Sequence, residues 1–180
     1  MKYLVIIILL VFFKVDAMNL TDYENLIKNS QSNTWELITD KVMGGKSDGK
    51  LEVLSDKRSF LRLQGNVSTE NNGGFIQFRS EFEIPNDDYN GIIFNARGNP
   101  EIYYVHIRTK YTFLPWQYYS AKFMVDEDWK TLKIKFDEFK KSNFYQPKNF
   151  TSSDITTVAF VAFGKNFKAK LDIFDAKLVE

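Results

Sequence analysis

The stretch Asn90-Gly91-Ile92-Ile93-Phe94-Asn95-Ala96-Arg97-Gly98-Asn99-Pro100-Glu101-Ile102-Tyr103-Tyr104-Val105-His106-Ile107-Arg108-Thr109 decides the fold class of this chain. Apolar residues alternate with polar or amphipathic ones along both halves, and Gly98-Asn99-Pro100 forms a break between them. A period of two places successive side chains on opposite faces of a strand. The stretch therefore predicts two β-strands, each with one face against a core.

Similar short runs recur from Trp35 to the end of the chain, and turn residues separate them. No long helical periodicity interrupts these runs, although a single helical turn is expected at residues 137–141. The pattern predicts an all-β jelly-roll sandwich formed by one domain over residues 35–180. The expected strands are Trp35–Thr39, Lys50–Leu54, Ser59–Gly65, Gly74–Ile84, Asn90–Arg97, Ile102–Thr109, Ala121–Val125, Lys130–Lys135, Ile155–Phe163 and Lys170–Leu178.

The N-terminal residues 1–17 match the pattern of a signal peptide. Lys2 precedes an apolar run of residues 4–13, and Val15-Asp16-Ala17 places small residues at the positions a signal peptidase requires. We expect cleavage after Ala17 and an exported protein, periplasmic or secreted; the alternative is an uncleaved anchor. Residues 18–34 would form an N-terminal segment with a short helix over Thr21–Lys28.

Composition excludes several kinds of chemistry. The chain has no cysteine and a single histidine, His106, so thiolate sites and multi-histidine metal sites are absent. Its 24 basic and 23 acidic residues give no global basic field to attract nucleic acid. The acidic residues 126–128 are interpreted as a turn ahead of a strand, and a structural Ca²⁺ bound there is the alternative. No cofactor and no metal ligand are assigned. We expect no catalytic residues, because no nucleophile and base occur in a recognisable arrangement.

A polar face is the first candidate for binding. If the strands around residues 74–109 are neighbours, their outward positions bring three arginines, a tyrosine, a histidine and two amides onto one sheet face. Such residues can bind a sugar or a carboxylate; the alternative is a solvated face with ordinary cross-strand charge pairs. With nearby aromatic residues, the candidate binding face consists of Trp35, Gln77, Arg79, Asn95, Arg97, Tyr104, His106, Arg108, Trp116 and Tyr119.

The aromatic residues Trp116, Tyr118 and Tyr119 follow Pro115 in what reads as a loop. Exposed aromatic loops serve sugar stacking or partner docking. Such residues also simply cap the end of a sandwich, and the sequence leaves both interpretations open.

Two glycine pairs form the strongest motif. They occur in Asp40-Lys41-Val42-Met43-Gly44-Gly45-Lys46-Ser47 and in Asn72-Gly73-Gly74-Phe75. Neither has the spacing of a phosphate-binding loop, and neither leads into a helix, so turns between strands are expected.

Together these segments resemble the complex I intermediate-associated protein 30 family, assembly factors for NADH:ubiquinone oxidoreductase and their bacterial relatives. The resemblance extends from Trp35 to the C-terminus. It implies a galactose-binding-domain-like jelly roll related to carbohydrate-binding modules, with no established catalytic residues. Further matching residues are Gly65-Asn66-Val67-Ser68, Arg79, Gly91-Ile92, Arg97-Gly98, the runs 103–108 and 119–123, Trp129 and the run 136–139.

The resemblance predicts a non-enzymatic binding domain that acts as a chaperone-like or scaffold factor through contacts with a protein partner, such as a membrane-associated complex. Its contact surface would combine the glycine loops with the polar face. The alternative is an exported carbohydrate-binding module of the cell envelope, which would use the same polar face and the aromatic loop.

Overall fold

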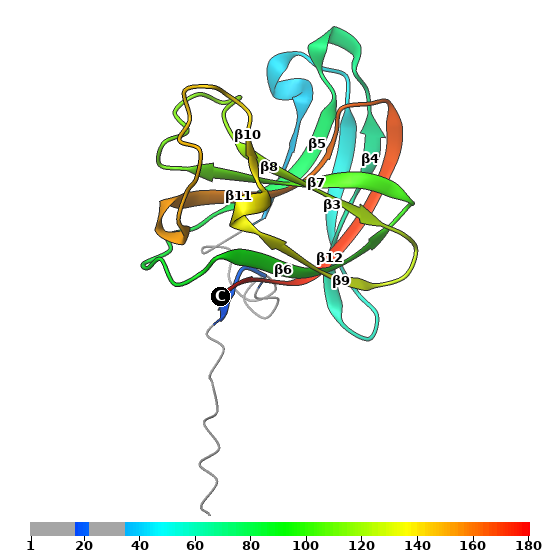
Figure 1. Ribbon diagram of the computed structural model, residues 1–180. Helices are drawn as coiled ribbons and strands as arrows, with labels where there is room; N and C mark the ends of the chain where they lie inside the picture. The colour runs from blue at the N-terminus through cyan, green and yellow to red at the C-terminus, as the bar shows by residue number, and fades with distance from the viewer. Residues whose placement is uncertain (1–16, 22–34) are drawn as a thin grey trace, which may run out of the picture.

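The computed structural model describes residues 17–21 and 35–180, which form a sandwich of two antiparallel sheets (Figure 1). We name each sheet after its central strand. The β12 sheet has the order β3 (Asp48–Ser55), β4 (Ser59–Val67), β12 (Phe167–Val179), β6 (Gly91–Gly98) and β9 (Lys130–Lys135), and β1 (Ala17–Asn19) also pairs with β12. The β11 sheet has the order β10 (Lys140–Lys141), β8 (Tyr119–Val125), β7 (Glu101–Thr109), β11 (Ile155–Phe163), β5 (Phe75–Glu81) and β2 (Glu36–Thr39).

The predicted all-β jelly roll is confirmed. β9 and β11 have the predicted bounds, and β5 ends at Glu81, three residues before its predicted end. The predicted helical turn is the 3₁₀ turn η3 (Phe136–Glu138). Two short strands, β1 and β10, carry no period long enough to be recognised. The other 3₁₀ turns are η1 (Asp40–Met43), η2 (Glu70–Asn72) and η4 (Ser152–Asp154).

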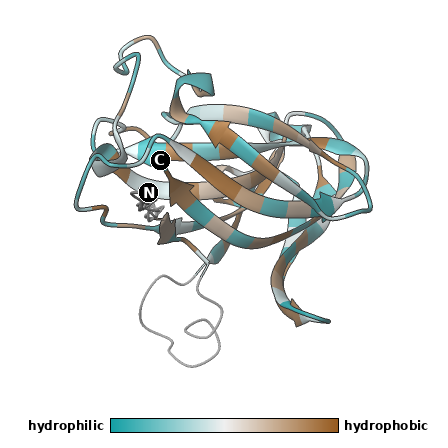
Figure 2. Cartoon of the chain, turned by 60° about the horizontal axis from the view of Figure 1, so that its bottom comes forward, coloured by the Kyte–Doolittle hydropathy of each residue, from teal (hydrophilic) through white to brown (hydrophobic). Residues whose placement is uncertain are grey.

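The core lies between the sheets, because the apolar half of each alternating strand faces inward. Figure 2 shows this alternation as bands of opposite hydropathy along the strands. At the centre Phe160 of β11 stacks on Phe78 of β5, with ring centroids 5.3 Å apart. Phe94 of the opposite sheet meets Phe160 edge-on at 5.1 Å. Such offset and edge-on ring pairs join the two sheets.

Residues 17–21 belong to the sandwich. Ala17 pairs with Val179 at the end of β12, and the backbone N–H of Leu20 donates to the carbonyl of Ala176 at 2.8 Å. Leu20 is buried, and its carbonyl accepts a hydrogen bond from Trp35 Nε1 at 3.3 Å.

Most of the predicted signal peptide, residues 1–16, and most of the predicted helix over Thr21–Lys28 lie outside the described residues. Within the described ranges, no helix has the length and apolar character needed to cross a membrane.

Candidate functional site

The predicted polar face is divided between the two sheets, so the expectation of one face with three arginines was wrong. Arg97 lies on β6, in the β12 sheet, together with Asn95. Arg79 and Arg108 lie on β5 and β7, in the β11 sheet. The reason is topological. β11, which comes much later in the chain, lies between β5 and β7, while β6 pairs with β12 and β9.

Trp35 and Tyr119 do not belong to any outer face, which corrects a second expectation. Trp35 is 8% exposed and packs edge-on against Phe78 with ring centroids 5.2 Å apart. Tyr119 is fully buried, and its hydroxyl donates to the carbonyl of Pro147 at 2.9 Å. Both rings are part of the core, Tyr119 because it occupies an inward position of β8.

The two arginines of the β11 sheet bind other parts of the chain. Arg79 Nε donates to Glu36 Oε1 at 2.8 Å and so ties β5 to β2. Arg108 Nη2 donates to the carbonyls of Thr112 at 3.0 Å and Leu114 at 3.3 Å. Burial, followed by the nearby positive charge of Arg79, lowers the pKa of Arg108. Both guanidinium groups therefore already form hydrogen bonds that stabilise the fold.

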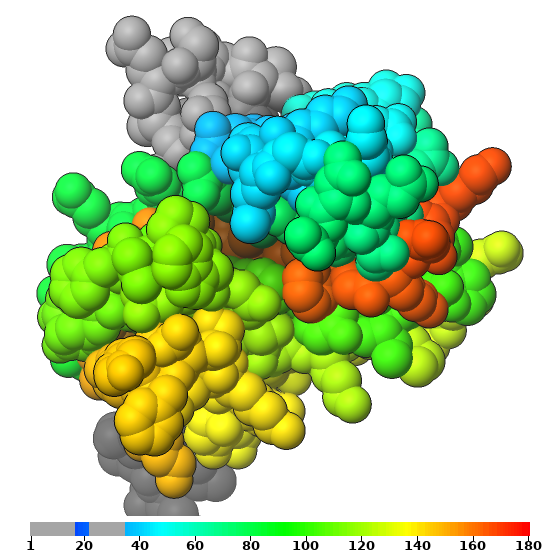
Figure 3. Space-filling view, turned by 90° about the horizontal axis from the view of Figure 1, so that it is seen from above, coloured from blue at the N-terminus to red at the C-terminus, as the bar shows by residue number. Residues whose placement is uncertain are grey.

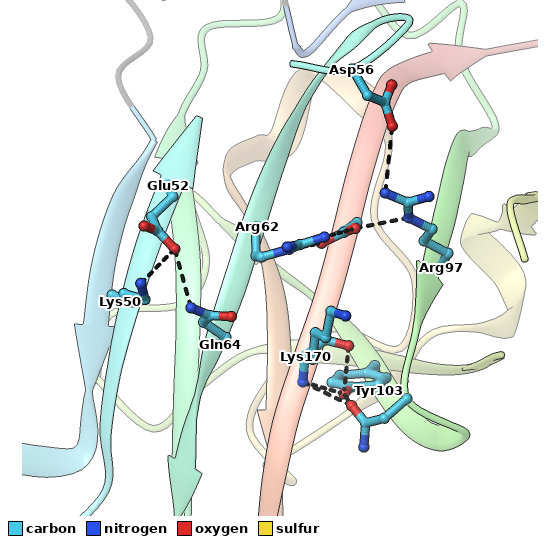
Figure 4. Close-up of polar contacts among 10 residues, drawn as sticks. Lys50, Glu52, Asp56, Arg62, Gln64, Arg97, Tyr103 and Lys170 are labelled. Carbon is cyan, nitrogen blue, oxygen red and sulfur yellow. Dashed lines mark hydrogen bonds and ion pairs between the residues drawn. The ribbon is translucent and has the colours of Figure 1, made fainter. Parts of the chain in front are cut away.

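Arg97 belongs to a network on the outer face of the β12 sheet (Figure 4). The carboxylate of Asp172 is almost fully buried and accepts from Arg62 Nε and Nη2, both at 2.6 Å, and from Arg97 Nε at 2.9 Å. The Arg97 guanidinium lies 4.5 Å from the centroid of Trp129 and 3.6 Å from Asp56. A buried carboxylate needs such pairing, so this network satisfies its own charges.

A cavity of about 380 Å³ lies beside this network on the same face. Its wall mixes basic and acidic side chains with a polar backbone turn. The lining residues are Arg62, Arg97, Gly98, Asn99, Glu127, Lys170 and Asp172.

A cluster of rings occupies the outer face of the β11 sheet. His106 stacks on Tyr118 with ring centroids 4.1 Å apart, and Tyr104 and Phe163 each lie about 6 Å from His106. We call these four residues the ring platform. Burial lowers the pKa of His106 to about 3, so its ring is neutral at physiological pH. Gln77 of β5 lies opposite Val161 of β11, on the same outer face as the ring platform.

Sequence reasoning had placed Tyr104 and His106 on a binding face but had missed Phe163 as their neighbour. Phe163 is the last residue of β11, at an outward position, and is 37% exposed. The run Val158–Phe163 is apolar throughout, so the sequence does not show which face Phe163 occupies, and pairing with β7 could not be inferred from it.

Asp40 joins the two glycine segments, which we call the signature loops (residues 40–47 and 68–74). Its carboxylate is fully buried and accepts from the Ser47 backbone N–H at 2.9 Å, the Ser47 hydroxyl at 2.5 Å and the Gly74 N–H at 2.5 Å. A longer bond of 3.3 Å comes from the N–H of Phe75, the first residue of β5. Burial raises the pKa of Asp40, but these hydrogen bonds outweigh it, and the net pKa is lowered.

The glycines of the signature are required by this arrangement. A Cβ on Gly45 or on Gly73 would overlap the Asp40 carboxylate. Gly44 and Gly74 have φ of +86° and +131°, which other residues rarely adopt. The neighbouring Asn72 also has a positive φ, 58°. The Asp, Gly and Ser residues of the signature therefore build the loops.

Two signature-loop residues have no such role. Val42 is 73% exposed and Met43 is 63% exposed, at the tip of η1. The loop that carries them is fixed, because the N–H groups of Gly44 and Gly45 donate to the carbonyls of Lys41 and Asp40. Two aliphatic side chains are thus held in solvent by a rigid turn.

Two further loops, residues 110–118 and 142–148, form a second pair that we call the aromatic loops. The buried amide of Gln146 joins them: its Oε1 accepts from the backbone N–H of Asn143 at 2.8 Å, and its Nε2 donates to the carbonyl of Tyr118 at 3.1 Å. Trp116, predicted as a binding residue, is 56% exposed here. Figure 3 shows the chain near residue 40 (cyan) and the aromatic loops (lime and yellow) on either side of a hollow, with β11 (orange) between them.

The acidic run 126–128 is a turn, as predicted. Asp126 Oδ1 accepts from the N–H of Asp128 at 3.2 Å, and Asp126 pairs with Lys130. In the part of the chain that the structure describes, no group of three or more acidic or histidine side chains is placed to hold a metal ion.

Comparison with known proteins gives the family. The profile of the complex I intermediate-associated protein 30 family matches residues 25–173. This chain belongs to that family. A search of curated proteins finds no match.

Solved structures similar to this chain include several carbohydrate-binding modules. The family 11 module of the cellulase Lic26A-Cel5E of Clostridium thermocellum has a TM-score of 0.68 and 16% identity over 93% of this chain and 96% of the module. The same module in complex with a β-1,3-1,4-mixed-linked tetrasaccharide gives the same score. The family 30 module of the Clostridium thermocellum cellulase Cel9D-Cel44B has a TM-score of 0.59 and 14% identity over 89% and 95% of the two chains. At such low identity these matches show a shared fold.

Proposed function

We propose that this member of the family is a non-enzymatic scaffold domain that holds a protein partner through Val42 and Met43. One observation carries the proposal: Asp40 and four glycines of the signature loops fix a turn whose exposed large apolar side chains are Val42 and Met43. Covering the apolar surface of Val and Met lowers the free energy of the complex, and the flexible side chain of Met adapts to partners of varied shape.

The surroundings support a partner larger than a small molecule. The segment that contains η1, which carries Val42 and Met43, lies beside the hollow on the β11 sheet (Figure 3), and this face contains the ring platform. A partner seated on the turn would extend over this face. A membrane-associated complex fits the family to which the chain belongs.

Co-purification from the native membrane fraction tests this proposal. The full chain, tagged at its C-terminus, is compared with Val42→Ser/Met43→Ser and with the control Val53→Ser, whose side chain is exposed on β3 in the other sheet. We expect a defined partner with the wild type and the control, and at least about a tenfold loss with the signature-loop variant, as for hot-spot residues. Equal recovery with all three proteins would refute the role of the turn.

A second candidate function is binding of a sugar chain at the ring platform. The observation that favours it is the set of rings on the outer face of the β11 sheet, in a fold shared with carbohydrate-binding modules. Tyr and Phe rings stack on the apolar faces of sugars, and Gln77 supplies an amide beside them.

Calorimetry with soluble β-glucan oligosaccharides separates the two candidates. Sugar binding predicts millimolar or tighter affinity that Tyr104→Ala abolishes and Val42→Ser/Met43→Ser leaves unchanged. The absence of heat at millimolar oligosaccharide, with partner capture intact, would reject the sugar-binding candidate.

An exported location is a further part of this proposal, supported by the apolar run of residues 4–13. N-terminal sequencing of the protein from its native source tests it. A chain that begins at Met18 supports export with cleavage after Ala17, whereas a chain that begins at Met1 refutes that cleavage.

A further inference from the structure

The aromatic loops carry a concentration of exposed apolar surface. Twelve large hydrophobic residues are exposed in the described part of the chain, and six of them lie in these two short loops. Phe113 is 81% exposed, Phe144 83% and Tyr145 87%. The other three are Tyr111, Leu114 and Trp116. Soluble surfaces show single apolar residues routinely, but a contiguous group of this kind marks an interaction site.

Buried polar groups fix the backbone of these loops. The loop backbone therefore holds the rings at the surface. Ser142 Oγ donates to the carbonyl of Trp116 at 3.0 Å, and the N–H of Tyr118 donates back to Ser142 Oγ at 3.0 Å. Gln117 is buried, and its Oε1 accepts from the N–H of Leu114 at 3.0 Å. Figure 1 shows the two loops side by side at one end of the sandwich. Their apolar side chains can therefore reach one surface together.

The two loops themselves carry basic side chains and no acidic ones. Residues 110–125 and 139–151 contain no Asp or Glu. Lys140, Lys141 and Lys148 lie in or beside the second loop, and in the described structure none of them pairs with a carboxylate. Lys141 instead donates to the carbonyls of Phe144 and Gln146, both at 2.9 Å, which leaves its charge uncompensated. Lys110 differs, because it pairs with Asp154 at 2.8 Å.

We propose that the aromatic loops dock this domain onto an anionic lipid surface. Phe and Leu side chains would enter the acyl region, while Trp116 and Tyr145 would lie at the headgroup level that suits rings with a polar end. The lysines would contact the acidic headgroups, each adding a favourable electrostatic contribution that salt screens. Apolar loop tips, bordered by lysines and with no carboxylate in the loops themselves, are typical of a surface that binds anionic lipid. The surface is separate from Val42 and Met43, so a bound membrane leaves the proposed protein contact free.

Trp116 provides a local probe of this contact. Of the three tryptophans, Trp35 is buried in the core and Trp129 packs against Phe174, so only Trp116 stands in a loop tip. The full chain is mixed with vesicles of phosphatidylcholine, alone or with phosphatidylglycerol, that contain brominated acyl chains. Bromine quenches only a tryptophan that enters the bilayer. Because the apolar run at residues 4–13 can also tether the chain, quenching is compared with that of Phe113→Ser/Phe144→Ser, in which this run is unchanged.

We expect quenching with the anionic vesicles, little with phosphatidylcholine alone, and loss of the signal in Trp116→Phe. Phe113→Ser/Phe144→Ser and Lys140→Glu/Lys148→Glu should each weaken vesicle affinity by about tenfold or more, since each lysine near the surface contributes on the order of 1 kcal/mol. The matched controls are Val53→Ser/Met124→Ser and Lys57→Glu/Lys168→Glu, which lie outside the loops and should bind like the wild type.

Absence of quenching with either vesicle would overturn the proposal, as would equal quenching with both. If the loops bind a protein instead, vesicles would not quench Trp116. That protein would co-purify with the wild type and not with Phe113→Ser/Phe144→Ser. The scaffold function is tested separately. It is supported if Phe113→Ser/Phe144→Ser keeps the partner and Val42→Ser/Met43→Ser loses it, whatever the lipid result.

Discussion

The signature loops and the aromatic loops stand on opposite sides of the same hollow, and each pair is joined by one buried polar side chain. In the signature loops that side chain is the carboxylate of Asp40. In the aromatic loops it is the amide of Gln146. The carboxylate lies so close to the backbone that Gly45 and Gly73 cannot carry a Cβ, whereas the amide places no such demand on its neighbours.

This difference explains why the residues of the first pair of loops form a recognisable motif and those of the second pair do not. A buried charge that accepts several backbone hydrogen bonds constrains the identity of many residues around it. The recognisable motif is therefore a requirement of the fold. The groups available for binding are the ones the fold does not use: Val42 and Met43 in one pair, and the exposed rings in the other.

Substitution Asp40→Ala should produce the largest loss of stability. It leaves the buried backbone N–H groups of Ser47 and Gly74 without their acceptor. We expect the free energy of unfolding to fall by about 3–5 kcal/mol. Urea denaturation measures this change, with Gln146→Ala as the matched variant in the aromatic loops, where about 1 kcal/mol is expected. Similar losses for the two variants would remove the contrast between the loop pairs.

Substitutions of the signature glycines should show which positions require the absence of a side chain and which require a positive φ. Gly45→Ala and Gly73→Ala force a methyl group into the Asp40 carboxylate and should each cost about 3 kcal/mol. Gly44→Ala meets open space and should cost only about 1–2 kcal/mol, for its positive φ. Thermal unfolding of the three variants gives the order. A larger loss for Gly44→Ala would contradict the role assigned to Asp40.

Acidification should affect the two sides of the hollow in different pH windows. The folded pKa of His106, about 3, lies below its unfolded value near 6.5, so its contribution to stability is complete above pH 6.5 and is lost as pH falls toward 3. We expect a loss of about 1 kcal/mol between pH 7 and pH 5.5. The lowered pKa of Asp40 acts only below about pH 4, where its contribution is lost.

Unfolding of the wild type and of His106→Gln across this range tests the assignment. His106 is the only histidine, so the slope between pH 6.5 and pH 4.5 should largely disappear in the variant. An unchanged slope would show that the ring of His106 becomes protonated in the folded state.

Substitution of the exposed tips should have the smallest effect on stability. Val42→Ser/Met43→Ser and Phe113→Ser/Phe144→Ser remove side chains that are mostly in solvent. We expect each pair to change the free energy of unfolding by less than about 0.5 kcal/mol, as is usual at such positions. Denaturation curves provide the measurement, and a loss of 2 kcal/mol or more would mean that these residues belong to the core.

The fold could be predicted from the sequence because each long strand carries its own alternation. Ile76 and Phe78, or Tyr103 and Val105, show which face is buried without knowledge of any neighbour. The short strands β1 and β10 have no such internal signal and form only because β12 and β8 offer them an edge.

The candidate site could be predicted only in part, because strand order depends on residues far apart in the sequence. Gln77, Tyr104 and His106 were correctly expected at outward positions of one sheet, but Arg97 was placed beside them although β6 lies in the other sheet. Trp35 and Tyr119 show a second limit. An aromatic residue next to a turn can equally close the core or face the solvent, and only packing decides.

Photo-crosslinking from residue 43 tests the central claim most directly. A photoreactive amino acid replaces Met43 or, as a control, Val53 on β3, and the full chain is irradiated in its native membrane fraction. We predict a discrete protein adduct from position 43 that excess wild-type chain suppresses and excess Val42→Ser/Met43→Ser does not, with no such adduct from position 53. No adduct at position 43, or one that both competitors suppress equally, would contradict it.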